Sequence, residues 1–203
     1  MNTSKLNTSI VFPKETVDCQ NYYFFNPGFS SEELDIIYKG VSLLPFKPAI
    51  IGNNEENPDI RTSSIKWVPP TDEWRWLYEK MMHQIVEANN AIWHFDLDYL
   101  IDNIQYTEYY AENGGHYTWH QDVGAGEMSK RKVSITVQLS DPSEYEGGDL
   151  EYFKGGNPEE AVKAPRGKGV VFIFPSYMMH RVTKVTKGIR RSFVLWVGGE
   201  HYK

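Results

Sequence analysis

The spacing of apolar residues divides the chain into two parts. Before residue 100, two segments repeat apolar side chains every three or four positions, as an amphipathic helix does. These residues are Leu34, Ile37, Tyr38 and Val41 in the first segment, and Trp74, Leu77, Met81, Ile85 and Ala88 in the second. Ser30 and Ser31 precede the first segment and suit a helix N-cap. We therefore predict helices over about 31–41 and 72–90, with their apolar faces packed on a sheet.

The same N-terminal part contains shorter signals for strands. Tyr22–Phe25 is an aromatic cluster closed by Pro27, and Ser63–Val68 ends at a pair of prolines, so both are predicted strands. Residues 45–62 are rich in proline, glycine and asparagine and lack an apolar repeat. This composition predicts an irregular segment beside the mouth of a site.

After residue 100 the helical repeat stops, and short apolar stretches follow one another. Their predicted bounds are 104–110, 117–120, 133–139, 148–153, 163–164, 169–174, 180–185 and 190–197. Turns rich in glycine, proline, asparagine and aspartate separate most of them, which is typical of an antiparallel sandwich or jelly roll. We predict an α+β, mainly β, fold in a single domain over 1–203. Residues 1–100 support a jelly roll over 104–198.

Composition narrows the choice of partners and compartment. The net charge of −6 argues against a basic face for nucleic acid or anionic lipid. Cys19 is the only cysteine, so no disulfide can form within the protein and a reducing compartment is expected. The first eight residues lack the apolar run of a signal peptide, and no later stretch is long enough to span a membrane. The sequence thus predicts a cytoplasmic protein without nucleic-acid or membrane partners.

The strongest chemical signal is a His-x-Asp pair, His120 and Asp122, followed downstream by His180. Residues two positions apart on an extended segment leave the same face, so both side chains of the pair can reach one ion. Two neutral imidazoles and one carboxylate occupy one face of an octahedral Fe(II) and leave three positions for a chelating co-substrate and dioxygen. We predict these three residues as metal ligands.

A second His-x-Asp pair, His94 and Asp96, competes with the first. Its polar residues alternate with Trp93, Phe95 and Leu97, which is the pattern of a half-buried strand with its polar face in solvent. The pair also lacks the glycines that flank His120 and Asp122 on both sides. We therefore expect this second pair to be solvated and to bind no metal.

An ordered set of short motifs accompanies the metal ligands. The set comprises Tyr109, Gly114-Gly115, 145–150, Gly167-Lys168-Gly169, Phe174-Pro175-Ser176, His180-Arg181-Val182 and Gly188-Ile189-Arg190. With these motifs, residues from about 104 to 198 resemble the catalytic domain of the Fe(II)- and 2-oxoglutarate-dependent dioxygenases, in the prolyl-4-hydroxylase-like branch. The resemblance implies a double-stranded β-helix in which His120, Asp122 and His180 form the facial triad.

Arg190 is the candidate residue for an anionic co-substrate. On an extended strand Arg190 and Ser192 share one face, while Arg191 lies on the other. A guanidinium can hold the distal carboxylate of 2-oxoglutarate with two charge-assisted hydrogen bonds. We predict Arg190 and Ser192 as co-substrate residues and Arg191 as the outward one. The alternative for Arg190 is a solvated charge at a strand end.

The resemblance also implies a tyrosine that binds the co-substrate. Tyr109 is preferred, although Tyr110 fits an ungapped spacing almost as well, because strand alternation places Tyr110 on the opposite face. Tyr117 and Trp119 are candidates for the substrate mouth. His116 shares their segment, and an ordinary surface position is the preferred interpretation for it.

The activity that the resemblance implies is hydroxylation of an organic substrate with Fe(II), 2-oxoglutarate and O2. Succinate and CO2 are released, and ascorbate is a candidate reductant. A prolyl residue in a peptide or protein is the expected substrate, and a free amino acid or small metabolite is the alternative. A non-catalytic metal-binding jelly-roll module is a further alternative, and it would not need Arg190. We expect a peptide groove between 45–62, with Arg61 near its end, and 112–119.

Overall fold

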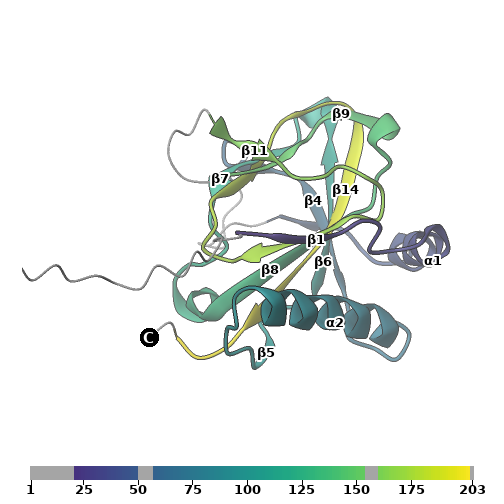
Figure 1. Ribbon diagram of the computed structural model, residues 1–203. Coiled ribbons are helices and arrows are strands. Elements are labelled where there is room, and N and C mark those ends of the chain that lie inside the picture. Colours follow the sequence, from purple (N-terminus) through teal and green to yellow (C-terminus); the bar gives the residue numbers. More distant parts are fainter. Residues whose placement is uncertain (1–20, 50–56, 154–159, 202–203) are drawn as a thin grey trace, which may run out of the picture.

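The computed structural model describes residues 21–49, 57–153 and 160–201. Two antiparallel sheets of unequal size make up its body (Figure 1). The larger runs in the order β1 (Tyr23–Phe25), β12 (Val171–Pro175), β8 (Arg131–Gln138), β14 (Val185–Gly198), β6 (Ile104–Tyr110), β4 (Ser64–Val68) and β2 (Lys47–Pro48). Two further strands, β5 (Tyr99–Leu100) and β9 (Tyr145–Gly147), pair with β14.

The smaller sheet lies against the larger one and carries most of the predicted metal ligands. It runs in the order β11 (Val162–Lys163), β10 (Leu150–Tyr152), β13 (His180–Val182), β7 (His116–His120) and β3 (Arg61–Thr62). Short 3-10 turns η1 (Ala111–Asn113), η2 (Gly126–Lys130) and η3 (Pro142–Glu144) lie between strands. This mainly β architecture of antiparallel strands confirms the predicted jelly roll.

Helices α1 (Ser31–Ser42) and α2 (Arg75–Ala91) cover the outer face of the larger sheet. Their apolar stripes pack on side chains that alternate along the strands, so that Phe193, Leu195 and Val197 of β14 join the core beneath the helices. The residues between them on β14 point the other way, toward the smaller sheet. The main hydrophobic core therefore lies between the two helices and the outer face of the larger sheet. The inner face of this sheet, which looks toward the smaller sheet, lines the candidate site.

The two helices begin and dock as their sequences suggest. Ser30 caps α1 in a capping box, in which its Oγ accepts from the Glu33 backbone N–H and the Glu33 carboxylate accepts from the Ser30 N–H. The same Glu33 carboxylate accepts from Lys80 Nζ at 2.6 Å, which ties α1 to α2. Among the residues that the structure describes, no helix is long and apolar enough to cross a membrane.

Two predictions about the N-terminal part need correction. Residues 93–97 do not form a strand, because the Asn89 side chain binds both the N–H and the carbonyl of Phe95 and so replaces a strand partner. His94 has a positive φ of 53° and is exposed with Asp96, so their solvated interpretation is confirmed. The segment 45–62 is not wholly irregular, since it contains β2 and β3, and residues 50–56 lie outside the described part.

Candidate active site

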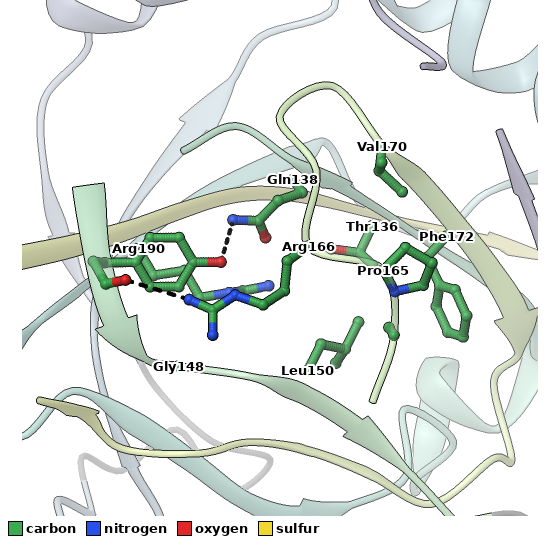
Figure 2. Close-up of a pocket in the computed structure, with 11 residues that line it drawn as sticks. Thr136, Gln138, Gly148, Leu150, Pro165, Arg166, Val170, Phe172 and Arg190 are labelled. Carbon is green, nitrogen blue, oxygen red and sulfur yellow. Dashed lines mark hydrogen bonds between the residues drawn. The ribbon is translucent and has the colours of Figure 1, made fainter. Parts of the chain in front are cut away.

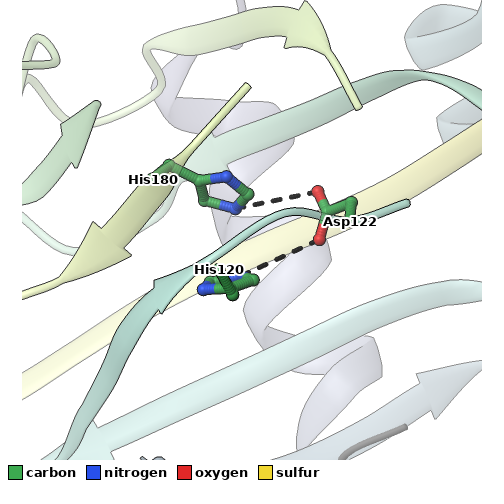
Figure 3. A group of neighbouring side chains, drawn as sticks. All are labelled: His120, Asp122 and His180. Carbon is green, nitrogen blue, oxygen red and sulfur yellow. Dashed lines mark ion pairs between the residues drawn. The ribbon is translucent and has the colours of Figure 1, made fainter. Parts of the chain in front are cut away.

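The three predicted metal ligands converge between the two sheets. His120 ends β7 and His180 begins β13, and the two are direct register partners. Asp122 follows two positions after His120 and faces both imidazoles (Figure 3). One ligand atom from each residue lies within 4.8 Å of the others. A small contraction around an ion would bring all three into its coordination shell, as the facial arrangement requires.

The ring nitrogens of both histidines are arranged for metal binding. His120 Nδ1 lies 2.7 Å from the Thr118 carbonyl and His180 Nδ1 lies 2.9 Å from the Met178 carbonyl. A carbonyl only accepts, so each Nδ1 carries the proton and each Nε2 presents a lone pair. The Nε2 atoms stand 3.8 Å and 3.7 Å from the oxygens of Asp122, too far for hydrogen bonds and suitably placed for a shared ion.

The protonation states also favour a cation. Burial lowers the pKa of His120 to about 3, and the neighbouring His180 adds to this effect. Burial alone would raise the pKa of Asp122, but the two imidazoles, the Ser134 hydroxyl and Arg131 outweigh it, so the pKa of this carboxyl falls below its usual range. His120 is therefore a neutral imidazole and Asp122 a carboxylate, and both are donors that suit a divalent metal such as Fe(II).

Hydrogen bonds to its backbone and carboxylate fix Asp122 in place. Ser134 Oγ donates to Asp122 Oδ2 at 2.6 Å and lies 3.0 Å from Ser176 Oγ. The Asp122 N–H donates to the Ser176 carbonyl at 2.9 Å, and Arg131 Nη1 donates to the Asp122 carbonyl at 3.2 Å. Such outer contacts orient a ligand before the ion arrives.

A bulge in β7 brings Tyr117 to the metal site. His120 pairs with His180 and Tyr117 pairs with Val182, so three steps on β7 match two on β13. The extra residue reverses the alternation, and the Tyr117 ring stacks on the His120 imidazole with centroids 3.5 Å apart. Tyr117 therefore lines the cavity as predicted. Trp119 instead lies against Arg181, whose guanidinium carbon is 4.6 Å from the indole centroid.

A cavity that opens to solvent, with about 460 Å³ of empty space including its mouth, joins the predicted metal ligands to Arg190. Its walls come from both sheets and are formed by Arg61, Gln105, Tyr109, Tyr117, His120, Asp122, Thr136, Leu150, Phe174, His180, Val182, Arg190, Ser192, Val194 and Trp196. The apolar residues among them shield the ligands from bulk water. The lining, with a cation and a cluster of metal-ligating side chains among apolar residues, suits a small anionic co-substrate.

Arg190 is a buried cation in this cavity. Its residue is 3% exposed, its Nη1 donates to Ser192 Oγ at 3.2 Å, and its guanidinium carbon stands 5.5 Å from the Tyr109 ring centroid. Within residues 21–49, 57–153 and 160–201, no carboxylate forms an ion pair with it. Because a buried charge without a counter-ion is costly, the arrangement favours an anionic ligand here.

A second hollow of about 290 Å³ adjoins the first behind Arg190 (Figure 2). Thr136 and Leu150 line both spaces with Arg190, and Arg166 borders the second. The Arg166 guanidinium is already paired, since its Nη1 donates to Asp149 at 2.7 Å. Arg190 is thus the cation left for an anion at this end of the cavity.

Arg191 and Tyr110, the neighbours of Arg190 and Tyr109 in the sequence, lie on the outer face of the same strands. Arg191 faces away from the cavity, and its Nε donates to Glu108 Oε1 at 3.0 Å. Tyr110 also lies on that face and donates to Glu108, whereas Tyr109 lines the cavity beside its register partner Arg190. Burial opposes ionisation of Glu108, but hydrogen bonds from Tyr106, Tyr110 and Arg191 outweigh it and lower its pKa.

Sequence reasoning did not assign several residues of this cavity. Gln105, Thr136, Phe174 and Trp196 line it, and the only available signal is the alternation along β14, which places Trp196 on the same face as Arg190 and Ser192. His116 does not line the cavity; it is half-buried, with its two ring nitrogens near the carbonyls of Gly114 and Asp59. The two segments expected to form the walls of a groove are joined at one end, where Arg61 of β3 is the register partner of Tyr117 in β7, and the groove itself stays a prediction.

Comparisons with known proteins agree with this geometry. The model of the 2OG-Fe(II) oxygenase superfamily matches residues 104–198. A PKHD-type hydroxylase of Picosynechococcus sp. is 39% identical over 84 residues, which are 41% of this chain and 37% of that protein. The matched region thus spans well under half the length of this curated relative.

Two solved structures share the fold. A prolyl hydroxylase of Trichoplax adhaerens, in complex with a hypoxia inducible factor peptide fragment, has a TM-score of 0.71 at 17% identity, over 88% of this chain and 83% of that one. A Pseudomonas putida prolyl-4-hydroxylase has a TM-score of 0.68 at 20% identity, over 88% and 93%. Residues 104–198 are therefore similar to the 2OG-Fe(II) oxygenase superfamily, and the chain shares the fold of the two solved prolyl hydroxylases.

Proposed function

We propose that this protein is an Fe(II)- and 2-oxoglutarate-dependent dioxygenase that hydroxylates a prolyl residue in a peptide or protein. The observation that carries the proposal is one cavity that contains both a His-Asp-His triad and a buried arginine without a carboxylate partner among the described residues. The triad alone would also suit a metal-binding module without redox chemistry. Burial of the Arg190 charge is costly unless an anion binds beside it in the cavity, and 2-oxoglutarate would supply that anion.

Each residue of the cavity has a distinct task in this proposal. Nε2 of His120, Nε2 of His180 and a carboxylate oxygen of Asp122 hold the metal. Arg190 and Ser192 bind the distal carboxylate of 2-oxoglutarate, with the Tyr109 hydroxyl beside them. These residues orient the co-substrate before substrate arrives, which is the main service a protein gives to cofactor chemistry.

When bound, Fe(II) and 2-oxoglutarate supply the oxidising chemistry that uses O2 to convert a C–H bond to C–OH, with release of succinate and CO2. The protein's apolar residues keep water from the reacting atoms. Phe174 packs edge-on to His180 with ring centroids 4.7 Å apart. Leu150, Val182 and Val194 complete the apolar lining of the cavity.

The prolyl substrate and the conditions of turnover are the finer parts of the proposal. The solved neighbours include a prolyl hydroxylase that holds a peptide, which supports a peptide or protein substrate. Tyr117 offers an aromatic face in the cavity for a proline ring. Ascorbate is the proposed reductant, and the single cysteine favours a reducing compartment such as the cytoplasm.

The test is incubation of the purified protein with Fe(II), 2-oxoglutarate and ascorbate, with proline-containing peptides or free proline added. Mass spectrometry should detect one added oxygen atom on a peptide, and succinate should form in equal amount. The Asp122→Ala variant is the matched control and should form neither product. Succinate formation that requires free proline would instead identify a small-molecule dioxygenase. Metal binding without succinate under any condition would leave the non-catalytic module.

A further inference from the structure

A second arginine, Arg61, reaches the same cavity from the opposite side. It lies on β3, the edge strand of the smaller sheet, as the register partner of Tyr117 in β7. It is half-buried, and it lines the cavity together with the metal ligands and Arg190. Its guanidinium carbon stands 4.9 Å from the centroid of the Tyr117 ring, which itself stacks on His120. Arg61 is therefore one side chain removed from the metal site.

Neutral groups hold this guanidinium in position. Arg61 Nε donates to Ser63 Oγ at 2.9 Å, and its Nη2 donates to Gln105 Oε1 at 2.8 Å. Both acceptors are uncharged, and the remaining Nη1 has no acceptor among the residues that the structure describes. The side chain is thus oriented at two points while its charge and one nitrogen stay available.

The position of Arg61 separates it from the proposed co-substrate. Arg61 contacts β6 at Gln105, to which it donates a hydrogen bond, whereas Arg190 is the register partner of Tyr109. The two contact points on β6 are therefore four residues apart. This spacing corresponds to about 13 Å along a strand. The two carboxyl carbons of 2-oxoglutarate are four bonds and about 5 Å apart. With one carboxylate at the metal and the other at Arg190, 2-oxoglutarate does not need Arg61.

Other groups at this end of the cavity also offer donors without acceptors. Trp196 is 7% exposed, and its Nε1 has no hydrogen-bond partner among the described residues. Asp122 is the only carboxylate among the described residues that line the cavity, and the bound metal would neutralise it. A buried indole N–H without an acceptor is costly unless a ligand supplies one. This end therefore lacks an anionic acceptor.

From this arrangement we infer that Arg61 binds a carboxylate of the substrate. The substrate is then a peptide segment whose acidic side chain or free terminal carboxylate lies close to the hydroxylated residue. The inference rests on the proposed function, because it assigns 2-oxoglutarate to Arg190. It makes Arg61 a specificity residue for substrate charge, with Gln105 and Ser63 as the groups that orient it.

The test uses matched peptides that each contain one proline. One peptide is neutral and amidated, one carries a glutamate near the proline, and one ends in a free carboxylate. Wild-type protein should oxidise a charged peptide with a kcat/KM at least about tenfold above the neutral one, and the preference should weaken at high salt. The free-carboxylate peptide separates a terminal carboxylate from an acidic side chain. Calorimetric binding to the metal-free protein gives a second reading of the same preference.

Three variants make the assignment specific. Arg61→Gln should reduce the charge preference to about twofold or less, while Arg61→Lys should retain part of it. Arg75→Gln, at an exposed arginine of α2, is the matched control and should behave as wild type. In Arg61→Gln, the loss should appear in the kcat/KM for the charged peptides rather than in the KM for 2-oxoglutarate, and Arg75→Gln should keep the slow formation of succinate without peptide.

The outcomes separate this inference from the proposed function. Equal oxidation of charged and neutral peptides by wild-type protein would overturn the role of Arg61 and leave the dioxygenase intact. A higher KM for 2-oxoglutarate in Arg61→Gln, with unchanged peptide preference, would move Arg61 to the co-substrate site and also overturn the inference. Absence of succinate from wild type under every condition would refute the proposed function itself. Thermal unfolding of each variant checks that it is folded.

Discussion

Replacement of Arg190 by alanine is the sharpest test of the co-substrate site. Arg190 is 3% exposed and donates a hydrogen bond to Ser192, and no carboxylate among the described residues neutralises its charge. The proposed partner is the distal carboxylate of 2-oxoglutarate. In the Arg190→Ala variant this carboxylate would enter the same enclosed space without its cation.

The expected size of the effect follows from burial. Truncation of one partner of a buried, hydrogen-bonded charge pair costs about 2–5 kcal/mol. We expect the lower half of this range, because Ser192 and Thr136 remain as hydroxyl donors beside the vacated space. A loss of about 2–3 kcal/mol corresponds to a rise of about 30- to 150-fold in the KM for 2-oxoglutarate. Metal affinity should change little, since Arg190 contacts no metal ligand.

The assay measures succinate formation against 2-oxoglutarate concentration, together with direct binding of labelled 2-oxoglutarate by equilibrium dialysis. Arg191→Ala is the matched control, because Arg191 is the next residue of β14 and points to the outer face. It should destabilise the fold by about 1–2 kcal/mol through loss of the Glu108 pair. It should change the KM by no more than about twofold. A larger KM effect from Arg191 than from Arg190 would refute the assigned register.

Three further outcomes follow from the structure. Alanine at any one of the three metal ligands should abolish metal binding and succinate formation, whereas His94→Ala should retain both in metal titration and turnover assays. The pKa of Glu108 lies below its ordinary value of 4.5, so its carboxylate stabilises the fold above that pH, and the stabilisation is lost as pH falls through the lowered pKa. Urea unfolding at decreasing pH should therefore show a steeper loss in wild type than in Glu108→Gln, and parallel curves would contradict this. Gly188→Ala should lower the free energy of unfolding by about 1–3 kcal/mol, because φ at this position is +69° and a Cβ would lie 2.0 Å from the Glu144 carbonyl oxygen. Thermal unfolding measures this loss, and an unchanged melting temperature would contradict it.

The clustering of the three candidate metal ligands was predictable because local rules place them. A two-residue spacing sends His120 and Asp122 to one region at a strand end, and His180 is the register partner of His120 once β7 and β13 pair. The same alternation separates Arg190 from Arg191 on β14, and its outcome there is clear, since Phe193 and Leu195 enter the helix-covered core. The part of the site that depends on period two was therefore visible in the sequence.

The parts that failed depend on contacts between distant residues. The bulge in β7 is set by its pairing with β13; Tyr117 reaches the cavity as predicted, but Trp119 lies against Arg181 instead. No sequence pattern in residues 116–120 predicts the additional residue of this β-bulge. Residues 93–97 alternate like a strand, and only the position of Asn89 on α2 decides that its side chain takes the place of a neighbouring strand. Tertiary context determined both results.

The long strand β14 couples the two halves of the proposed chemistry. It carries Arg190 and Ser192 at one end of the cavity and Val194 and Trp196 at the other, all on one face. A shift of one residue in its pairing with β6 would exchange this face for the core face and place Arg191 in the cavity. The Arg191–Glu108 pair on the outer face opposes such a shift, because it forms only in the observed register. The same pairing of β14 with β6 thereby fixes the distance between Arg190, the proposed co-substrate residue, and the end of the cavity near Arg61, where we place the substrate.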